Sequence, residues 1–262
     1  MIIDCHSHLS KMSKAETWEN AIEKLISDMR ENNIGKRIII ADNVSNSNCA
    51  DTKRLLELKG GSANLFIIGS VNPFTCSDKD IDYFDQLLGT GKVVGLKIFP
   101  GHDKIFANDK SFLSSIDLCL KHDVPLTIHT GINTGNRECA KYNNPKLIVE
   151  LAKKYPKLKI IIAHYFWPNL DYCFEITSGM DNIYFDTSGL ADNEIISGSG
   201  SLNKIKLILE KTNKRSPHHI MFGTDYPMCR TDKHKDLVGM LNISASNKEN
   251  ILSKNSMRIF SL

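Results

Sequence analysis

Side chains that can bind a metal ion or transfer a proton recur within or directly after short apolar runs of the chain. The pair His6 and His8 follows the first run, and single polar residues end or occupy later ones, namely Lys97, His129, His164 and Asp225. Neutral imidazole is a common ligand of zinc and other divalent metals, and it also transfers protons near neutral pH. Because residues two apart on a strand share one face, His6 and His8 can reach one ion. The pattern predicts a metal site formed by His6, His8, His129 and Asp225.

Each of these signals has an ordinary structural explanation when it is taken alone. An HxH pair is a weak motif, a histidine that ends an apolar strand is often a hydrogen-bonded structural residue, and Asp225 could be a helix cap or a turn residue. Their conjunction favours a site, because burying several such groups without partners would cost several kcal/mol. Histidines together with one carboxylate would leave a position open for water, as catalytic metal sites do.

Short runs rich in β-branched residues are the elements that must position these groups. They cover residues 2–5, 37–41, 65–71, 93–99, 124–129, 159–164, 182–186 and 219–223, and their starts lie roughly 31 residues apart, the spacing of a strand–helix unit. Between them, apolar residues at spacings of three and four predict helices over 16–32, 80–88, 111–122, 145–155, 168–177, 201–212, 235–241 and 248–260.

The runs over 38–41 and 160–163 are apolar on both faces, which is typical of strands in a buried parallel sheet. Alternation of such strands with helices predicts an α/β fold, a single (β/α)8 TIM barrel that forms one domain over residues 1–262. In such a barrel, catalytic groups gather at the carboxyl ends of the strands, where the polar residues stand. An open doubly wound sheet is the alternative, but no GxGxxG or P-loop motif supports it.

The composition excludes several classes of protein. With 33 basic and 30 acidic residues the net charge is +3, which gives no overall bias toward nucleic acid or an anionic membrane. No apolar run approaches the ~18 residues of a membrane span, and the first residues lack the pattern of a secretory signal. The 7 cysteines, an odd number without CxxC pairs, indicate reduced thiols. We expect a cytoplasmic protein with a small-molecule substrate and no nucleic-acid or membrane partner, and a homo-oligomer is left open.

Segments in order from the first residue to the last resemble the amidohydrolase superfamily. Within it, they resemble the amidohydrolase-related (Amidohydro_2) branch that also contains aminocarboxymuconate-semialdehyde decarboxylase. The segments are MIIDCHSHL, VVGLKIFPG, VPLTIHTG, LKIIIAHYF, FGTDYPM and the closing ENILSKNSMRIFSL. The HxH pair is typical of the whole superfamily, whereas FGTDYP and the closing segment are typical of the branch. The resemblance implies that His6, His8, His129 and Asp225 are metal-associated. It also implies that Asp225 accepts the proton of a metal-activated water, and that His164 is a second ligand or an acid/base residue.

Lys97 leaves the number of metal ions open. An ammonium group inside a barrel needs a carboxylate partner or a lowered pKa. Two-metal members of the superfamily carbamylate a lysine on the fourth strand, and GLKIF resembles that context. The branch nearest this sequence generally uses one metal, and a lysine that pairs with the substrate or with a neighbouring acid is the alternative. We expect one divalent ion, zinc or alternatively manganese, and two ions if Lys97 is carbamylated.

The loops after the strands supply candidates for substrate binding, which are His102, Arg137, Tyr165 and Trp167. An arginine can hold a substrate carboxylate with two parallel hydrogen bonds, although Arg137 could equally be a solvated loop cation. Asp4, two residues before His6 on the same face, is expected to support the ligands rather than to bind the ion.

These observations predict a metal-dependent hydrolase that acts on an amide, lactone or ester of a small molecule, with Asp225 and His164 as catalytic residues. A non-oxidative decarboxylase or hydratase on the same site is the main alternative, because the resembling branch includes such lyases. A TatD-like nuclease is less favoured, since a glutamate would be expected where Lys97 stands. A noncatalytic metal-binding barrel is the last alternative, and the sequence does not name a substrate.

Overall fold

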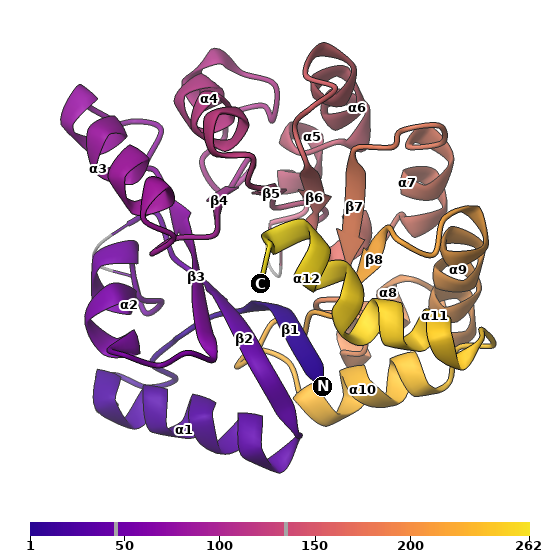
Figure 1. The fold of residues 1–262 in the computed structure, drawn as a ribbon. Helices are drawn as coiled ribbons and strands as arrows, with labels where there is room; N and C mark the ends of the chain where they lie inside the picture. Colours follow the sequence, from indigo (N-terminus) through magenta and orange to yellow (C-terminus); the bar gives the residue numbers. More distant parts are fainter. Residues whose placement is uncertain (45–46, 134–135) are drawn as a thin grey trace.

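The structure is a computed structural model that describes residues 1–44, 47–133 and 136–262. Eight strands pair in parallel in the order of the chain, β1 to β8, and surround a common centre (Figure 1). Their bounds are β1 Ile2–Ser7, β2 Ile34–Ile40, β3 Leu65–Ser70, β4 Gly95–Ile98, β5 Leu126–Ile128, β6 Ile160–Ile162, β7 Ile183–Asp186 and β8 Ile220–Met221. The strand order never reverses, as it must in a doubly wound sheet. The predicted (β/α)8 barrel is therefore confirmed.

Helices fill the segments between the strands and surround the sheet. Their bounds are α1 Trp18–Glu31, α2 Thr52–Lys59, α3 Asp78–Gly89, α4 Leu113–His122, α5 Cys139–Tyr142, α6 Pro145–Lys154, α7 Leu170–Ile176, α8 Asn193–Gly198, α9 Leu202–Arg215, α10 Thr231–Gly239, α11 Ala245–Glu249 and α12 Asn255–Phe260. The helix predicted over 248–260 is divided, because a π-helical turn over Asn250–Lys254 separates α11 from α12. The described residues contain no helix with the length and apolar character of a membrane span.

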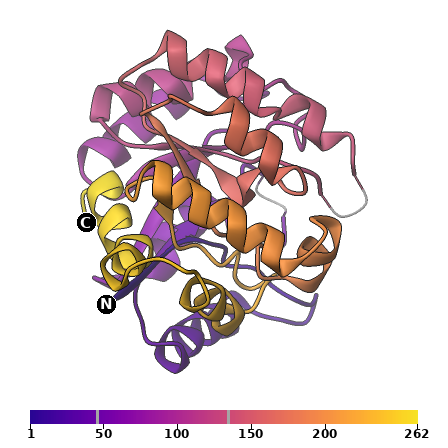
Figure 2. The ribbon, with the colours of Figure 1, turned by 90° about the vertical axis from the view of Figure 1, so that its right-hand side faces the viewer.

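Two apolar cores hold the barrel together. The larger lies between the strands and the surrounding helices, and the smaller fills the barrel interior. Ile259 and Phe260 of α12 belong to the interior core, together with Ile38, Ile161 and Met221 from the strands. Helix α12 thus plugs one end of the barrel, where both ends of the chain also lie (Figures 1 and 2).

The join between the first and the last strand is less regular than the other strand pairs. Instead of a continuous ladder, the backbone N–H of Cys5 donates to the carbonyl of Phe222 at 2.8 Å, and the N–H groups of Thr224 and Asp225 donate to the carbonyl of His6. An isolated parallel bridge joins Ser7 to Tyr226. Strand β8 is shorter than its predicted range of 219–223, because the chain leaves the strand direction to make these contacts. This join is called the seam below.

Candidate active site

Strand β1 carries His6 into the barrel and His8 follows the end of the strand, and both side chains are buried. His6 Nδ1 lies 2.6 Å from Asp186 Oδ2, and His8 Nδ1 lies 3.1 Å from the carbonyl oxygen of Ile40. Both partners are acceptors, so each ring donates its Nδ1 proton. Burial lowers the pKa of His6 to about 3, which keeps this ring neutral. His6 therefore keeps an unprotonated Nε2, and the Nε2 of His8 is the ring nitrogen that does not face Ile40.

Asp225 faces these two nitrogens from the turn that follows β8. Its Oδ1 lies 3.6 Å from His6 Nε2 and 3.4 Å from His8 Nε2. Burial would raise the pKa of Asp225, but the neighbouring histidines hold it well below its usual value, so the carboxylate is ionised. Three electron-rich atoms thus converge within 4.8 Å of one another.

This donor set fits a divalent cation. His6 Nε2 is buried and has no hydrogen-bond partner within the described part of the chain. Two imidazole lone pairs and a carboxylate oxygen repel one another unless a positive charge lies between them. Imidazole and carboxylate are the ligand types that zinc and manganese accept.

Asp186, the last residue of β7, connects several residues of the site through hydrogen bonds. Its carboxylate accepts hydrogen bonds from His6 Nδ1, from the backbone N–H of His164 at 3.0 Å and from the backbone N–H of Ser188 at 3.1 Å. Burial would raise the pKa of Asp186, but the hydrogen bonds that it accepts from His6 and Ser188 lower it, so the group stays ionised. A carboxylate behind a ligating histidine fixes the orientation and the tautomer of the ring. Sequence reasoning missed Asp186, although it ends its strand as the polar residues of other strands do.

His164 follows β6 in an unusual backbone conformation. His164, Tyr165 and Phe166 all have positive φ, at 57°, 52° and 57°, and the left-handed conformation costs about 1–2 kcal/mol for each residue with a side chain. Tertiary contacts hold the turn, since the N–H of Phe166 donates to Thr130 Oγ1 at 2.9 Å. The turn brings the His164 ring beside His6, with the two ring centroids 4.8 Å apart.

Ser188 determines which nitrogen of His164 is free. Its hydroxyl donates to Asp186 Oδ1 and lies 2.9 Å from His164 Nδ1. Because the single hydroxyl proton goes to the carboxylate, Ser188 Oγ accepts the proton of His164 Nδ1. Burial lowers the pKa of His164, so the ring is neutral and its Nε2 is a free acceptor.

Lys97 lies inside the barrel on β4 and is only 1% exposed. Among the described residues, no hydrogen bond or ion pair reaches its Nζ, which lies 5.4 Å from the centre of the Phe99 ring. Burial lowers the pKa of Lys97 to about 8, while Asp186 and Asp225 act in the opposite direction. This environment suits an amine that forms an ion pair with an anion bound in the cavity. The carbamylation of Lys97 stays a prediction.

The residues predicted to do chemistry share a cavity at the carboxyl ends of the strands. One cavity of about 240 Å³ is lined by His8, Lys97, His102, His129, His164 and Asp225, among others. A neighbouring cavity of about 280 Å³ is lined by His129, His164, Trp167 and Asp225. These volumes suit a small molecule rather than a polymer.

The four residues predicted to bind substrate are placed differently. His102 and Trp167 line these cavities, and Trp167 Nε1 is already bonded to the carbonyl of Ile195 at 2.8 Å. Tyr165 is buried outside the barrel, where its hydroxyl pairs with Thr212 on α9. Arg137 is exposed and lines neither cavity. The structure therefore brings His102 and Trp167 to the site, but not Tyr165 or Arg137.

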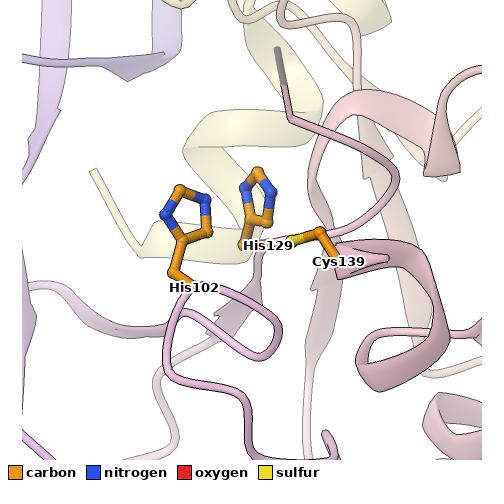
Figure 3. Close-up of side chains that lie close together, drawn as sticks. All are labelled: His102, His129 and Cys139. Carbon is orange, nitrogen blue, oxygen red and sulfur yellow. The ribbon is translucent and has the colours of Figure 1, made fainter. Parts of the chain in front are cut away.

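His129 lies beside the His6–His8–Asp225 set without being part of it. Its ring centroid is 5.1 Å from that of His164 and 4.4 Å from that of His102. Its nearest group of possible ligands is His102 and Cys139, whose side chains converge with its own (Figure 3). The predicted role of His129 as a ligand of the same ion as His6, His8 and Asp225 stays a prediction.

A barrel whose strand ends bring imidazoles, a lysine and carboxylates to one cavity has the architecture of a TIM-barrel enzyme. The model of the amidohydrolase family matches residues 73–262, and the chain belongs to this family. The matched segment contains Lys97, His129, His164 and Asp225, whereas His6 and His8 lie before it. The resemblance to the amidohydrolase superfamily is therefore confirmed, and the chain is an enzyme of that superfamily.

Solved structures share the fold at low sequence identity. An uncharacterised TIM-barrel protein from Bordetella bronchiseptica is 19% identical, with a TM-score of 0.76 over 93% of this chain and 83% of that one. A probable 2-pyrone-4,6-dicarboxylic acid hydrolase from Acinetobacter baumannii with bound citric acid is 14% identical, with a TM-score of 0.70 over 100% of this chain and 99% of that one. A dihydroxybenzoic acid decarboxylase from Polaromonas with bound manganese and the inhibitor 2-nitroresorcinol is 14% identical, with a TM-score of 0.69 over 100% and 97%. No curated protein sequence matches the chain.

Proposed function

We propose that this protein is a metal-dependent hydrolase that cleaves an amide, lactone or ester bond in a small molecule. The convergence of His6 Nε2, His8 Nε2 and Asp225 Oδ1 carries the proposal. The Nδ1 atoms of both rings are engaged in hydrogen bonds to other groups, so the Nε2 atoms are the ones that face the Asp225 carboxylate. These three residues would hold the ion, with His129 as the further ligand that the family resemblance implies. A bound divalent ion supplies Lewis acidity and activates water near neutral pH.

The chain's own residues then handle the proton and the developing charge. Asp225 is ionised and can accept the proton of the attacking water at its carboxylate, then return it to the leaving group. His164 presents a free Nε2 to the same cavity and can relay a proton or orient the water. Lys97 supplies the positive charge that would hold an anionic group of the substrate or stabilise an oxyanion.

A lyase that decarboxylates or hydrates its substrate is the second candidate function. It is favoured by the buried cation of Lys97, which would hold a carboxylate in the cavity. The decarboxylase from Polaromonas and the hydrolase from Acinetobacter share this fold, so the fold itself does not separate the two reactions. We rank hydrolysis first because Asp225 and His164 supply two separate proton acceptors around one cavity.

The remaining properties are proposed on narrower grounds. Zinc is our first choice of ion and manganese the second, because two imidazoles and one carboxylate suit both. All 7 cysteines are free, which agrees with a reducing compartment such as the cytoplasm. The cavity volumes support a small-molecule substrate. The extent of the domain, predicted as residues 1–262, stays a prediction.

The test compares the wild-type protein with Asp225→Asn on a panel of lactones, N-acyl amino acids and carboxylic esters, with acid release as the readout. Aromatic carboxylic acids, followed by release of carbon dioxide, test the lyase. We expect turnover on one set, its loss after removal of the metal with a chelator, and its recovery with zinc or manganese. Asp225→Asn should reduce turnover by about 100-fold or more with unchanged circular dichroism. Full activity of either the metal-free protein or Asp225→Asn would refute the proposal.

A further inference from the structure

We propose that Arg37 is a positioning residue that sets the affinity of the active site for its ion. It acts through Asp4 and Thr224. These two residues hold the backbone at His6 and at Asp225, which are proposed ligands. The inference rests on the proposed function, because it assigns a role to residues behind those ligands. Arg37, Asp4 and Thr224 line neither cavity at the strand ends, so their role is not contact with a substrate bound there.

Arg37 and Asp4 form an ion pair that is completely buried. Both side chains are 0% exposed, and Arg37 Nε on β2 lies 3.1 Å from Asp4 Oδ2 on β1. The guanidinium also reaches α1 and α10, since its Nη2 donates to Asp28 Oδ2 at 2.7 Å and to Thr231 Oγ1 at 3.3 Å. Replacing a buried ion pair by apolar residues of similar volume is often neutral or even stabilising. Stability alone therefore gives no reason for this pair.

Asp4 uses both carboxylate oxygens to hold the backbone beside the ligands. Its Oδ1 accepts the N–H of His6 at 3.2 Å and the N–H of Thr224 at 3.1 Å. Its Oδ2, which faces Arg37, also accepts the Thr224 hydroxyl at 2.7 Å. Strand β1 and the turn after β8 thus meet on one carboxylate at the seam. The rigid guanidinium fixes the orientation of that carboxylate, and with it the directions of the three hydrogen bonds.

The turn that carries Asp225 needs such support, because its backbone conformation is unfavourable. Asp225 has φ of +66°, in the left-handed region that residues with a side chain adopt infrequently. Groups on both sides hold it there. Thr224 Oγ1 accepts the N–H of Tyr226 at 3.1 Å, and the guanidinium carbon of Arg37 lies 4.7 Å from the centre of the Tyr226 ring. The direction of the Asp225 carboxylate therefore depends on contacts behind the turn.

The test measures zinc affinity by competition with a chelator of known affinity, on metal-free protein without a histidine tag. Thr224→Val keeps the size of the side chain and removes its hydroxyl. It cuts a link between Asp4 and the turn while Arg37 and Asp4 stay paired. We expect it to weaken zinc binding about 10-fold, and Arg37→Met to weaken it about 10- to 100-fold. Thr224→Ser keeps the hydroxyl and should bind zinc as the wild-type protein does.

A double-mutant cycle shows whether Arg37 acts through Asp225. In an Asp225→Asn background the carboxylate is already lost, so adding Arg37→Met should weaken zinc by a clearly smaller factor than it does in the wild-type protein. A general loosening of the fold would give the same factor in both backgrounds.

Asn182→Leu is the matched control for lost stability. Asn182 Nδ2 donates to the carbonyls of Ala152 at 3.2 Å and Leu158 at 3.0 Å, and the residue lies directly before β7, away from the seam. This variant should lower the midpoint of urea unfolding and leave the zinc affinity unchanged.

Two results would overturn the inference. The first is wild-type zinc affinity in folded Thr224→Val and Arg37→Met, and the second is an equal effect of Arg37→Met with and without the Asp225 carboxylate. A wild-type protein that binds no zinc would contradict the proposed function as well, whereas unchanged variants of a zinc-binding wild-type protein contradict the inference alone. If Arg37→Met does not fold, as judged by circular dichroism, the comparison of Thr224→Val with Thr224→Ser decides the question.

Discussion

Replacing Asp186 by asparagine tests how the site selects its histidine tautomers. Asp186 Oδ1 receives the N–H groups of His164 and Ser188, and Oδ2 receives His6 Nδ1. An asparagine can keep its oxygen at the first position, but its NH₂ group then faces His6. The His6 ring can satisfy that group only by accepting at Nδ1 and carrying its proton on Nε2, where the ion would be bound. Asp186→Asn should therefore impair ion binding at His6 and His8 far more than it impairs folding.

The size of both effects follows from the contacts. Loss of the carboxylate behind a ligating histidine reduces metal affinity about 10- to 100-fold, which corresponds to about 1.4–2.8 kcal/mol. The fold should lose only about 1 kcal/mol, because the donors to Oδ1 keep their acceptor and one hydrogen bond to His6 is exchanged for another.

Competition with a chelator of known affinity measures the ion binding, and urea unfolding of the metal-free protein measures the stability. Asp192→Asn is the matched control, since Asp192 lines the neighbouring cavity and caps α8 through the N–H of Glu194. It removes the same charge near the site without touching His6. A folded Asp186→Asn protein with wild-type metal affinity would refute the reasoning about the tautomer.

Three further predictions concern stability. Lys97→Met should raise the free energy of unfolding of the metal-free protein by about 1–4 kcal/mol, because it replaces a buried ammonium by an apolar chain of similar length; an equal or lower value in urea unfolding would show that the ammonium has a partner. Gly131→Ala should cost about 2–4 kcal/mol, since φ is +86° and the new Cβ would lie 2.3 Å from the carbonyl oxygen of Trp167. Gly91→Ala, with φ of +68° and nothing within 4 Å, is its control and should lose only about 1–2 kcal/mol. His234 is buried and its pKa is lowered by that burial, so its folded pKa lies below the unfolded value of about 6.5. Its contribution to stability is therefore complete above about pH 6.5 and is lost below it, by up to ~1.4 kcal/mol per pH unit. Urea unfolding at pH 7 and pH 5 should show a loss of stability of this sign, and His234→Gln should reduce the loss without abolishing it, because burial also lowers the pKa of His6 and His164.

Much of the fold could be predicted because β-branched runs and helical periodicity show which side chains are buried. In a barrel, every strand and every helix must bury a face against its neighbours. The regions that were missed are short helices whose starts depend on caps rather than on periodicity. Helix α2, Thr52–Lys59, begins where the Asp51 side chain accepts the N–H of Arg54 at 2.8 Å. Helix α8, Asn193–Gly198, begins in the same way at Asp192 and contains no buried residue.

Sequence reasoning anticipated that His6 and His8 lie close together, because residues two apart at a strand end share one face, and their role as ligands stays a prediction. Sequence reasoning failed where an unusual backbone conformation determines the direction of a side chain. Tyr165 was expected at the cavity, but the left-handed turn at residues 164–166 sends its ring outward, where it stacks on Phe185 with centroids 4.4 Å apart. Asp186 ends its strand with a side chain that binds other protein groups, a role that no local pattern distinguishes from a cap. Such choices depend on contacts between distant segments.

The seam between β1 and β8 gives the site formed by His6, His8 and Asp225 a role in the order of assembly. The histidines lie at the start of the chain and Asp225 lies near its end, so a growing chain has both imidazoles long before it has the carboxylate. Joining such distant segments is slow compared with forming local contacts. We therefore expect the nascent polypeptide to gain its ion only when the last strand docks. An ion bound by His6, His8 and Asp225 would then link the two sides of the seam. The barrel could open at the seam only after the ion is released.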